Sequence, residues 1–132
     1  MSMTETEMYE AVKEAIVGAL GVDEDEVTPD AKIFDDLGAE SIDLLDVLFR
    51  IERSTGVKIA ASDIGEHIQG GIPEEEFGTE EGVVSEKGLA QLKKVMPQID
   101  TNALAGNLRA EQVIGLFTVQ NLADLVSSRA GA

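Results

Sequence analysis

Ser41 is the side chain of this sequence best placed to take part in chemistry. It lies in the stretch DDLGAESIDLL, residues 35–45, between a glycine turn and an apolar run and among carboxylates. A serine that attacks a substrate by itself needs a histidine within hydrogen-bond reach and a third group that orients it. The only histidine is His67, in a glycine-rich region, and G-A-E-S-I-D is not the G-x-S-x-G elbow. Ser41 therefore either caps a helix, the commonest role of a serine at this position, or is a point of attachment.

The sequence lacks the residue patterns that other kinds of catalytic or metal site require. The chain has no cysteine, which excludes a thiolate nucleophile, a thiolate metal site and disulfides. The acidic run 23–26 is not an EF-hand, because the sixth position from Asp23 is Thr28 and the twelfth is Phe34. No glycine loop has the lysine of a phosphate-binding loop. We predict no catalytic residue and no metal site, so that any thiol must come from a cofactor.

The charge narrows the choice of partners. Twenty-six acidic residues against ten basic ones give a net charge of −16. Such a surface repels nucleic acid and attracts proteins with basic patches, although it also simply favours solubility. No apolar run reaches membrane-spanning length, and the N-terminus lacks the pattern of a signal peptide. These observations predict a soluble, cytoplasmic protein that neither spans a membrane nor binds nucleic acid.

The elements around Ser41 are predicted to be helices. Thr4 and Glu7 have the spacing of a capping box, and apolar residues then recur at helical spacing up to a stop at Gly21. Thr118 caps a last helix with an apolar face. Aromatic residues are scarce, so the core must be aliphatic, which suits packed helices.

The second helix is predicted to run from Ser41 to about Thr55, with Gly56 as its stop. Its apolar arc is wider than a surface helix needs for its core. The outer flank consists of Ile42, Leu45 and Phe49 and borders carboxylates. This flank is either exposed to a basic, partly apolar partner or covered by the long loop or the later insert.

The remaining segments are less regular. Residues 22–40 form a long connection held by apolar anchors, and 57–61 are too short to assign. The glycine-rich stretch after Ser62 is predicted to be a mobile loop that includes PEEEF. A helix follows from Ser85 to Met96, and another short one is predicted near 109–116.

The run DDLGAESIDLLDVLFRIE resembles the acyl carrier proteins, whose signature is D-S-L after a leucine-glycine turn, opening an acidic second helix. The resemblance extends to the first helix with its GVDEDEV continuation, to VKI and to TVQNLADLV, and covers about 4–61 and 114–129. Two departures stand out. The tripeptide is Glu40-Ser41-Ile42, and the segment between Ala61 and Thr118 is much longer than the one short helix of typical carriers.

The resemblance implies an all-α, antiparallel helical bundle: one domain, 1–132, with a partly helical insert at about 62–113. It implies that Ser41 carries 4′-phosphopantetheine, transferred from coenzyme A by a phosphopantetheinyl transferase, and that the thiol of this arm holds acyl groups as thioesters. The protein would be a carrier and not an enzyme. It would be a monomer that meets acyl-transferring, condensing or acyl-activating enzymes with basic docking surfaces. The expected contacts with these partners are Glu40, Ile42, Asp43, Leu45, Asp46 and Phe49, and the expected acyl-chain pocket is lined by Leu44, Val47, Leu48, Ile51 and Leu122.

Several alternatives stay open. The pathway is fatty-acid or specialised lipid synthesis, or the cargo is aminoacyl or polyketide, or the chain is an acidic adaptor that is never modified. The insert, through Leu89, Leu92 and Val95, either enlarges the acyl site or is a docking surface for one enzyme. Arg50 and Arg53 either select partners by repulsion or pair with Asp46 one turn away.

Overall fold

The computed structural model describes residues 4–130, except for the side chain of Glu111. Within this range the regular elements are helices, and the few antiparallel β-bridges are isolated. The predicted all-α class is confirmed. The elements are α1 (Glu5–Leu20), the 3₁₀ turn η1 (Glu24–Glu26), α2 (Ser41–Thr55), α3 (Ala61–Gln69), α4 (Glu74–Phe77), α5 (Glu86–Val95), α6 (Thr101–Leu104), the 3₁₀ turns η2 (Ala110–Gln112) and η3 (Ile114–Leu116), and α7 (Val119–Ala130).

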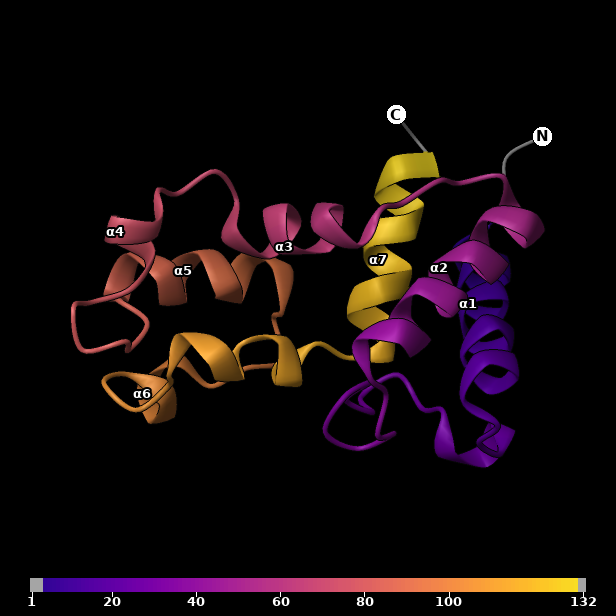
Figure 1. Cartoon of the computed structure of the whole chain (residues 1–132), viewed down its shortest axis with the longest axis horizontal. Coiled ribbons are helices and arrows are strands. Elements are labelled where there is room, and N and C mark those ends of the chain that lie inside the picture. The colour runs from indigo at the N-terminus through magenta and orange to yellow at the C-terminus, as the bar shows by residue number, and fades with distance from the viewer. Residues whose placement is uncertain (1–3, 131–132) are drawn as a thin grey trace. The chain divides into compact units, whose positions relative to one another are not determined.

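The chain divides into two compact units. Unit 1 consists of Met1–Ala61 and Phe117–Ala132, and it contains α1, α2 and α7. Unit 2 is the intervening segment Ser62–Leu116, which is coloured from magenta-pink to orange in Figure 1. Unit 1 is therefore built from two stretches that are far apart in the sequence.

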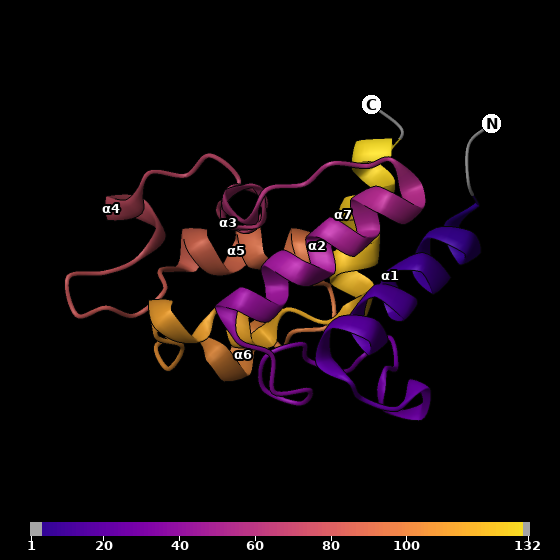
Figure 2. The same cartoon turned by 45° about the vertical axis from the view of Figure 1, so that its right-hand side comes forward.

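The core of unit 1 is aliphatic. Helix α1 packs against both α2 and α7, as Figure 2 also shows. The three helices contribute side chains that are fully shielded from solvent, among them Val12, Ile16, Val47, Ile51 and Leu122. Their burial is the main stabilising contribution of this unit, because apolar surface removed from water gains about 25 cal/mol per Å².

The start of α1 confirms the capping box. The Thr4 N–H donates to Glu7 Oε1 at 2.9 Å, and the Glu7 N–H donates to Thr4 Oγ1 at 3.1 Å. Hydrogen bonding of the Glu7 carboxylate by the Thr4 backbone N–H first, and by the Thr4 hydroxyl second, lowers the pKa of Glu7. At the other end, Gly21 takes a left-handed φ of 71° and ends the helix.

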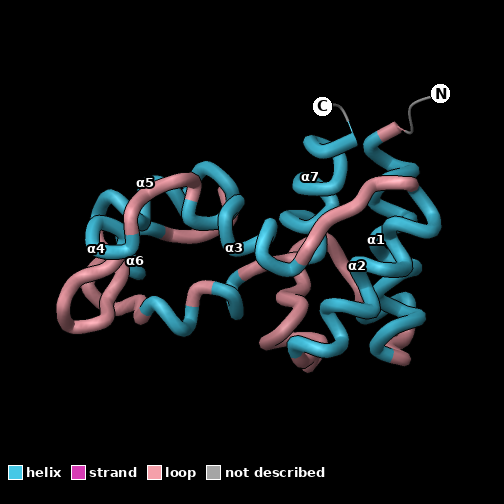
Figure 3. The backbone as a smooth tube through the Cα atoms, turned by 45° about the horizontal axis from the view of Figure 1, so that its top comes forward, coloured by secondary structure: helices cyan, strands magenta, loops and turns pink. Residues whose placement is uncertain are grey.

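The long connection before α2 is fastened to the beginning of α7. The Ile33 N–H donates to the Phe117 carbonyl at 3.1 Å, and the Val119 N–H donates to the Ala31 carbonyl at 3.0 Å. Ile33 is fully buried, and Val27 nearly so. Figure 3 draws most of this segment as loop. Its backbone is nevertheless held by these two hydrogen bonds, so that Ser41, which follows it, has a defined position.

The prediction of a mobile loop after Ser62 is wrong. This segment contains α3 and α4, and Ile64 and Ile68 of α3 are buried one turn apart while Gly65 lies on the exposed side. The apolar pair outweighs the glycine, whose preference against helix is only about 1 kcal/mol. Pro73, the proline of PEEEF, suits a helix start, and it occupies the N-cap position of α4.

The rest of unit 2 matches the sequence more closely. Ser85 caps α5, its Oγ accepting from the Gly88 N–H at 3.0 Å, and Leu89 and Leu92 lie in the core of the unit. Residues 109–116 form the 3₁₀ turns η2 and η3 and not an α-helix, and α6 was not predicted. Among the described residues, no helix combines the length and the apolar character needed to cross a membrane.

Two isoleucines of α2 provide a matched test of the core. Ile51→Ala should lower the free energy of unfolding by about 2–5 kcal/mol, because a fully buried side chain leaves a cavity. Ile42→Ala should change it by no more than about 0.5 kcal/mol, because Ile42 is 71% exposed. Urea unfolding followed by circular dichroism measures both. Equal losses would show that the burial of α2 is assigned to the wrong face.

Candidate functional site

Ser41 is the first residue of α2, and it is not the residue that caps the helix. The N-cap is Glu40, whose backbone is extended (φ −110°, ψ 171°). The Glu40 N–H donates to Asp43 Oδ2 at 2.9 Å, so the capping interaction joins Glu40 and Asp43. The Ser41 side chain is exposed and forms no hydrogen bond with any described residue. The alternative in which Ser41 serves only as a cap is therefore wrong.

The turn before Ser41 is rigid and open. The Gly38 N–H donates to the Phe34 carbonyl at 3.1 Å, and the Ala39 N–H donates to the Ile33 carbonyl at 3.2 Å. Gly38 has a left-handed φ of 74°, which requires glycine, and a Cβ added there would meet no atom within 4 Å. The space beside Gly38, three residues before Ser41, is thus open.

The residues near Ser41 in the sequence are acidic. Asp35 and Glu40 are exposed, and Asp43 and Asp46 are half-buried. His67 lies in α3, which belongs almost wholly to unit 2. Carboxylates beside the hydroxyl cannot raise its nucleophilicity as an imidazole does, so this arrangement suits a serine that another enzyme modifies.

The outer flank of α2 is exposed. Ile42, Leu45 and Phe49 are 71%, 56% and 57% accessible to solvent. We call these three residues the α2 strip. Within unit 1 the long loop leaves these side chains exposed, so the alternative in which the loop covers this flank is wrong. Three large apolar side chains at i, i+3 and i+7 form a patch of the kind that marks interaction sites.

The inner face of α2 belongs to the core. The side chains expected to line an acyl-chain pocket are all buried, at 7% exposure or less: Leu44, Val47, Leu48, Ile51 and Leu122. They come from α2 and α7 of unit 1. All five side chains are thus buried within unit 1.

The two arginines of α2 have different environments. Arg50 Nε lies 3.1 Å from Asp46 Oδ1, which confirms the expected pairing one turn away. Its guanidinium also packs over α1, where a Cβ added to Gly18 would lie 2.6 Å from Arg50 Nη1. Arg53 instead lies over the ring of Phe49, with its Cζ 5.8 Å from the ring centroid.

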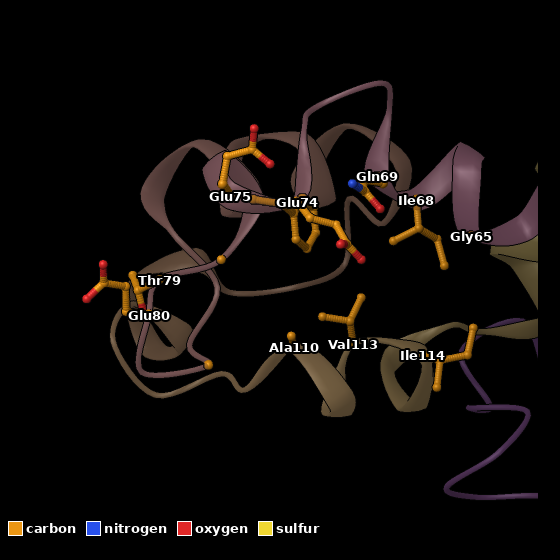
Figure 4. Close-up of a pocket in the computed structure, with 13 residues that line it drawn as sticks. Gly65, Ile68, Gln69, Glu74, Glu75, Thr79, Glu80, Ala110, Val113 and Ile114 are labelled. Atoms are coloured by element: carbon orange, nitrogen blue, oxygen red, sulfur yellow. The ribbon is translucent and has the colours of Figure 1, made fainter.

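Unit 2 contains a pocket that sequence reasoning missed. Its volume is about 820 Å³, within the range of small-molecule sites. Figure 4 shows the Glu74 side chain directed toward Ile68 and Val113, whereas Glu75 and Glu80 point away. The lining residues include no histidine, lysine or arginine, and Leu89, Leu92 and Val95 are not among them. The only signal in the sequence was the spacing of Ile64 and Ile68.

Comparison with known proteins covers the first half of the chain. Residues 10–68 match the family described as the phosphopantetheine attachment site. The chain is 48% identical over 62 residues to an acyl carrier protein of Petrotoga mobilis, an alignment that covers 47% of this chain and 73% of that protein. It is 54% identical over 54 residues to one of Solidesulfovibrio magneticus (41% and 69% covered) and 47% identical over 58 residues to one of Thermotoga maritima (44% and 72% covered).

The capping geometry predicts unequal effects for two residues in the first turn of α2. Asp43→Ala should lower the free energy of unfolding by about 0.5–2 kcal/mol, because the Glu40 N–H loses its acceptor. Ser41→Ala in the unmodified protein should change it by less than about 0.5 kcal/mol, because its hydroxyl has no partner among the described residues. Thermal and urea unfolding measure both changes. A larger loss of unfolding free energy for Ser41→Ala than for Asp43→Ala would show that the serine, and not Asp43, caps the helix.

Proposed function

The chain belongs to the acyl carrier protein family, and from this premise we propose that Ser41 is the residue that bears its 4′-phosphopantetheine arm. The prosthetic group of the family is phosphopantetheine, and the protein is a carrier and not an enzyme. A phosphopantetheinyl transferase and enzymes that handle acyl groups are its expected interaction partners.

The observation that carries the proposal is the free hydroxyl of Ser41. It is exposed, it forms no hydrogen bond with the described residues, and the capping of α2 is done by Glu40 and Asp43. It also stands within the matched segment 10–68. A serine that is unnecessary for the helix and open to solvent is available to form a phosphodiester.

The first turn of α2 fits the charge of such a phosphodiester. The first N–H groups of a helix have no partner within it, and this end of the 15-residue helix carries a partial positive charge. Negative groups are favoured at this position. When it is bound, the group supplies the thiol that the cysteine-free chain lacks, and acyl groups are held on it as thioesters.

The exposed face of α2 supports a role in docking. The proposed contacts combine the α2 strip with neighbouring carboxylates, namely Glu40, Ile42, Asp43, Leu45, Asp46 and Phe49. The apolar members supply area that a partner can bury, and the carboxylates attract basic partners and speed their encounter. Such contacts suit a shuttle, since exposed charges act more on the rate of association than on the strength of the complex.

The cargo is proposed to enter the aliphatic interior of unit 1. Leu44, Val47, Leu48, Ile51 and Leu122 present only hydrocarbon, and each methylene that leaves water for such surroundings gains about 0.8 kcal/mol. A chain of several methylenes would thereby offset the cost of parting the helices. We extend the proposal to fatty-acid or specialised lipid synthesis in the cytoplasm, with unit 1 as the carrier and unit 2 as the insert.

The attachment site can be tested by mass. The unmodified protein, incubated with coenzyme A, Mg²⁺ and a broad-specificity phosphopantetheinyl transferase, should gain the mass of one phosphopantetheinyl group. Ser41→Ala should gain none, because the hydroxyl that forms the ester is missing. Intact-protein mass spectrometry measures the gain.

Ser62→Ala serves as the matched control, since Ser62 is also exposed and lies in the first turn of a different helix, α3. It should be labelled like the wild type. Labelling of Ser41→Ala, or a wild type that stays unlabelled, would contradict the proposal. Identification of the thioester-bound group on the protein from native cells would then define the pathway.

A further inference from the structure

Arg53 is a positive charge at the far end of a docking face whose other end is acidic. Arg50 is compensated by Asp46, 3.1 Å away. Arg53 is exposed and forms no ion pair with any described residue; its recorded contact is with the Phe49 ring. Of the two arginines of α2, only Arg53 therefore presents its charge to a protein that approaches this face.

The position of Arg53 continues the α2 strip. Ile42, Leu45, Phe49 and Arg53 are related by i, i+3, i+7 and i+11, so they follow one line along the exposed side of the helix. With a rise of about 1.5 Å per residue, Arg53 lies about 18 Å along the axis from Ser41. A partner that reaches Ser41 and covers the strip must therefore also meet Arg53.

Phe49 holds the guanidinium in this position. An arginine that lies over an aromatic ring is attracted by the negative face of the ring, and its rotamers are restricted. Less side-chain freedom is then lost when a partner binds. Arg53 also lines a recess of about 400 Å³ together with Glu14, Ala15, Arg50 and Ser54, all within unit 1. Glu14 gives this recess a mixed charge. A partner therefore meets the positive charge of Arg53 on the side of the guanidinium that faces away from the recess.

We propose that the exposed face of α2 is a bipolar docking surface on which Arg53 determines specificity. The fitting partner is an enzyme with basic side chains opposite Glu40 and Asp43, an apolar depression for the α2 strip and a carboxylate opposite Arg53. A partner that is basic along the whole length of its docking face would place a cation against Arg53. Like charges brought together at an interface disfavour binding, so such partners are selected against.

This inference rests on the proposed modification of Ser41, because it concerns partners that reach that residue. The transferase is one of these partners, and one with a basic docking face can serve as the probe. The kcat/KM of labelling is measured for the wild type, Arg53→Gln and Arg53→Glu. Arg53→Glu should be labelled about two- to ten-fold faster than the wild type, with Arg53→Gln in between, because exposed charges of this kind mainly change association rates. The differences should shrink as salt is added.

Lys94→Glu is the matched control for net charge. Lys94 is an exposed residue of α5 in unit 2, and its reversal changes the total charge of the chain by the same amount. It should change kcat/KM much less than Arg53→Glu does. Circular dichroism of each variant checks that the helices are intact.

A double-mutant cycle tests the geometry. Lysines and arginines of the transferase docking face are changed singly to glutamate, and at least one of these variants should label the wild type faster than Arg53→Glu. Equal rates for the wild type, Arg53→Glu and Lys94→Glu, with no transferase variant that reverses the order, would overturn the docking inference alone. A wild type that no transferase labels would instead remove the proposed function, and the inference with it.

Discussion

Burial of one side of α2 determines what the other side can present. Val47 and Ile51 are fully enclosed in the interior that α2 shares with α1, and a helix held in this way cannot rotate about its axis without exposing them. Ile42 and Phe49, on the opposite side, are therefore exposed to solvent. The exposed strip is thus a consequence of the burial of the opposite side of the helix.

The backbone before α2 adds the second constraint. The connection is joined to the start of α7 by hydrogen bonds from Ile33 to Phe117 and from Val119 to Ala31. Since Asp43 completes the cap of α2 from inside the helix, the serine at its first position is left without a structural task. The hydrogen-bonded loop and the cap formed by Glu40 and Asp43 together explain how the Ser41 hydroxyl is held in place and remains exposed.

The sequence predicted the elements that have local signals. Thr4 and Glu7, Gly21, Ser85 and Thr118 set helix ends through hydrogen bonds between near neighbours, and these ends appear in the structure. The serine motif indicated Ser41 as the candidate site by resemblance. Its local pattern allowed two roles, which only the contact between Glu40 and Asp43 could separate. In unit 2, the recurring glycines, Gly65 among them, suggested a loop, whereas the burial of Ile64 and Ile68 depends on residues far along the chain.

The discontinuity of unit 1 has a consequence for the order in which the protein is made. Helices α1 and α2 leave the ribosome well before α7, which follows the whole of Ser62–Leu116. Until then Val12 and Ile16 lack part of their cover, because α7 is one of the two helices that pack on α1. Contacts between segments so distant in the chain form slowly. During synthesis, unit 1 therefore remains incomplete until the whole of unit 2 has been translated.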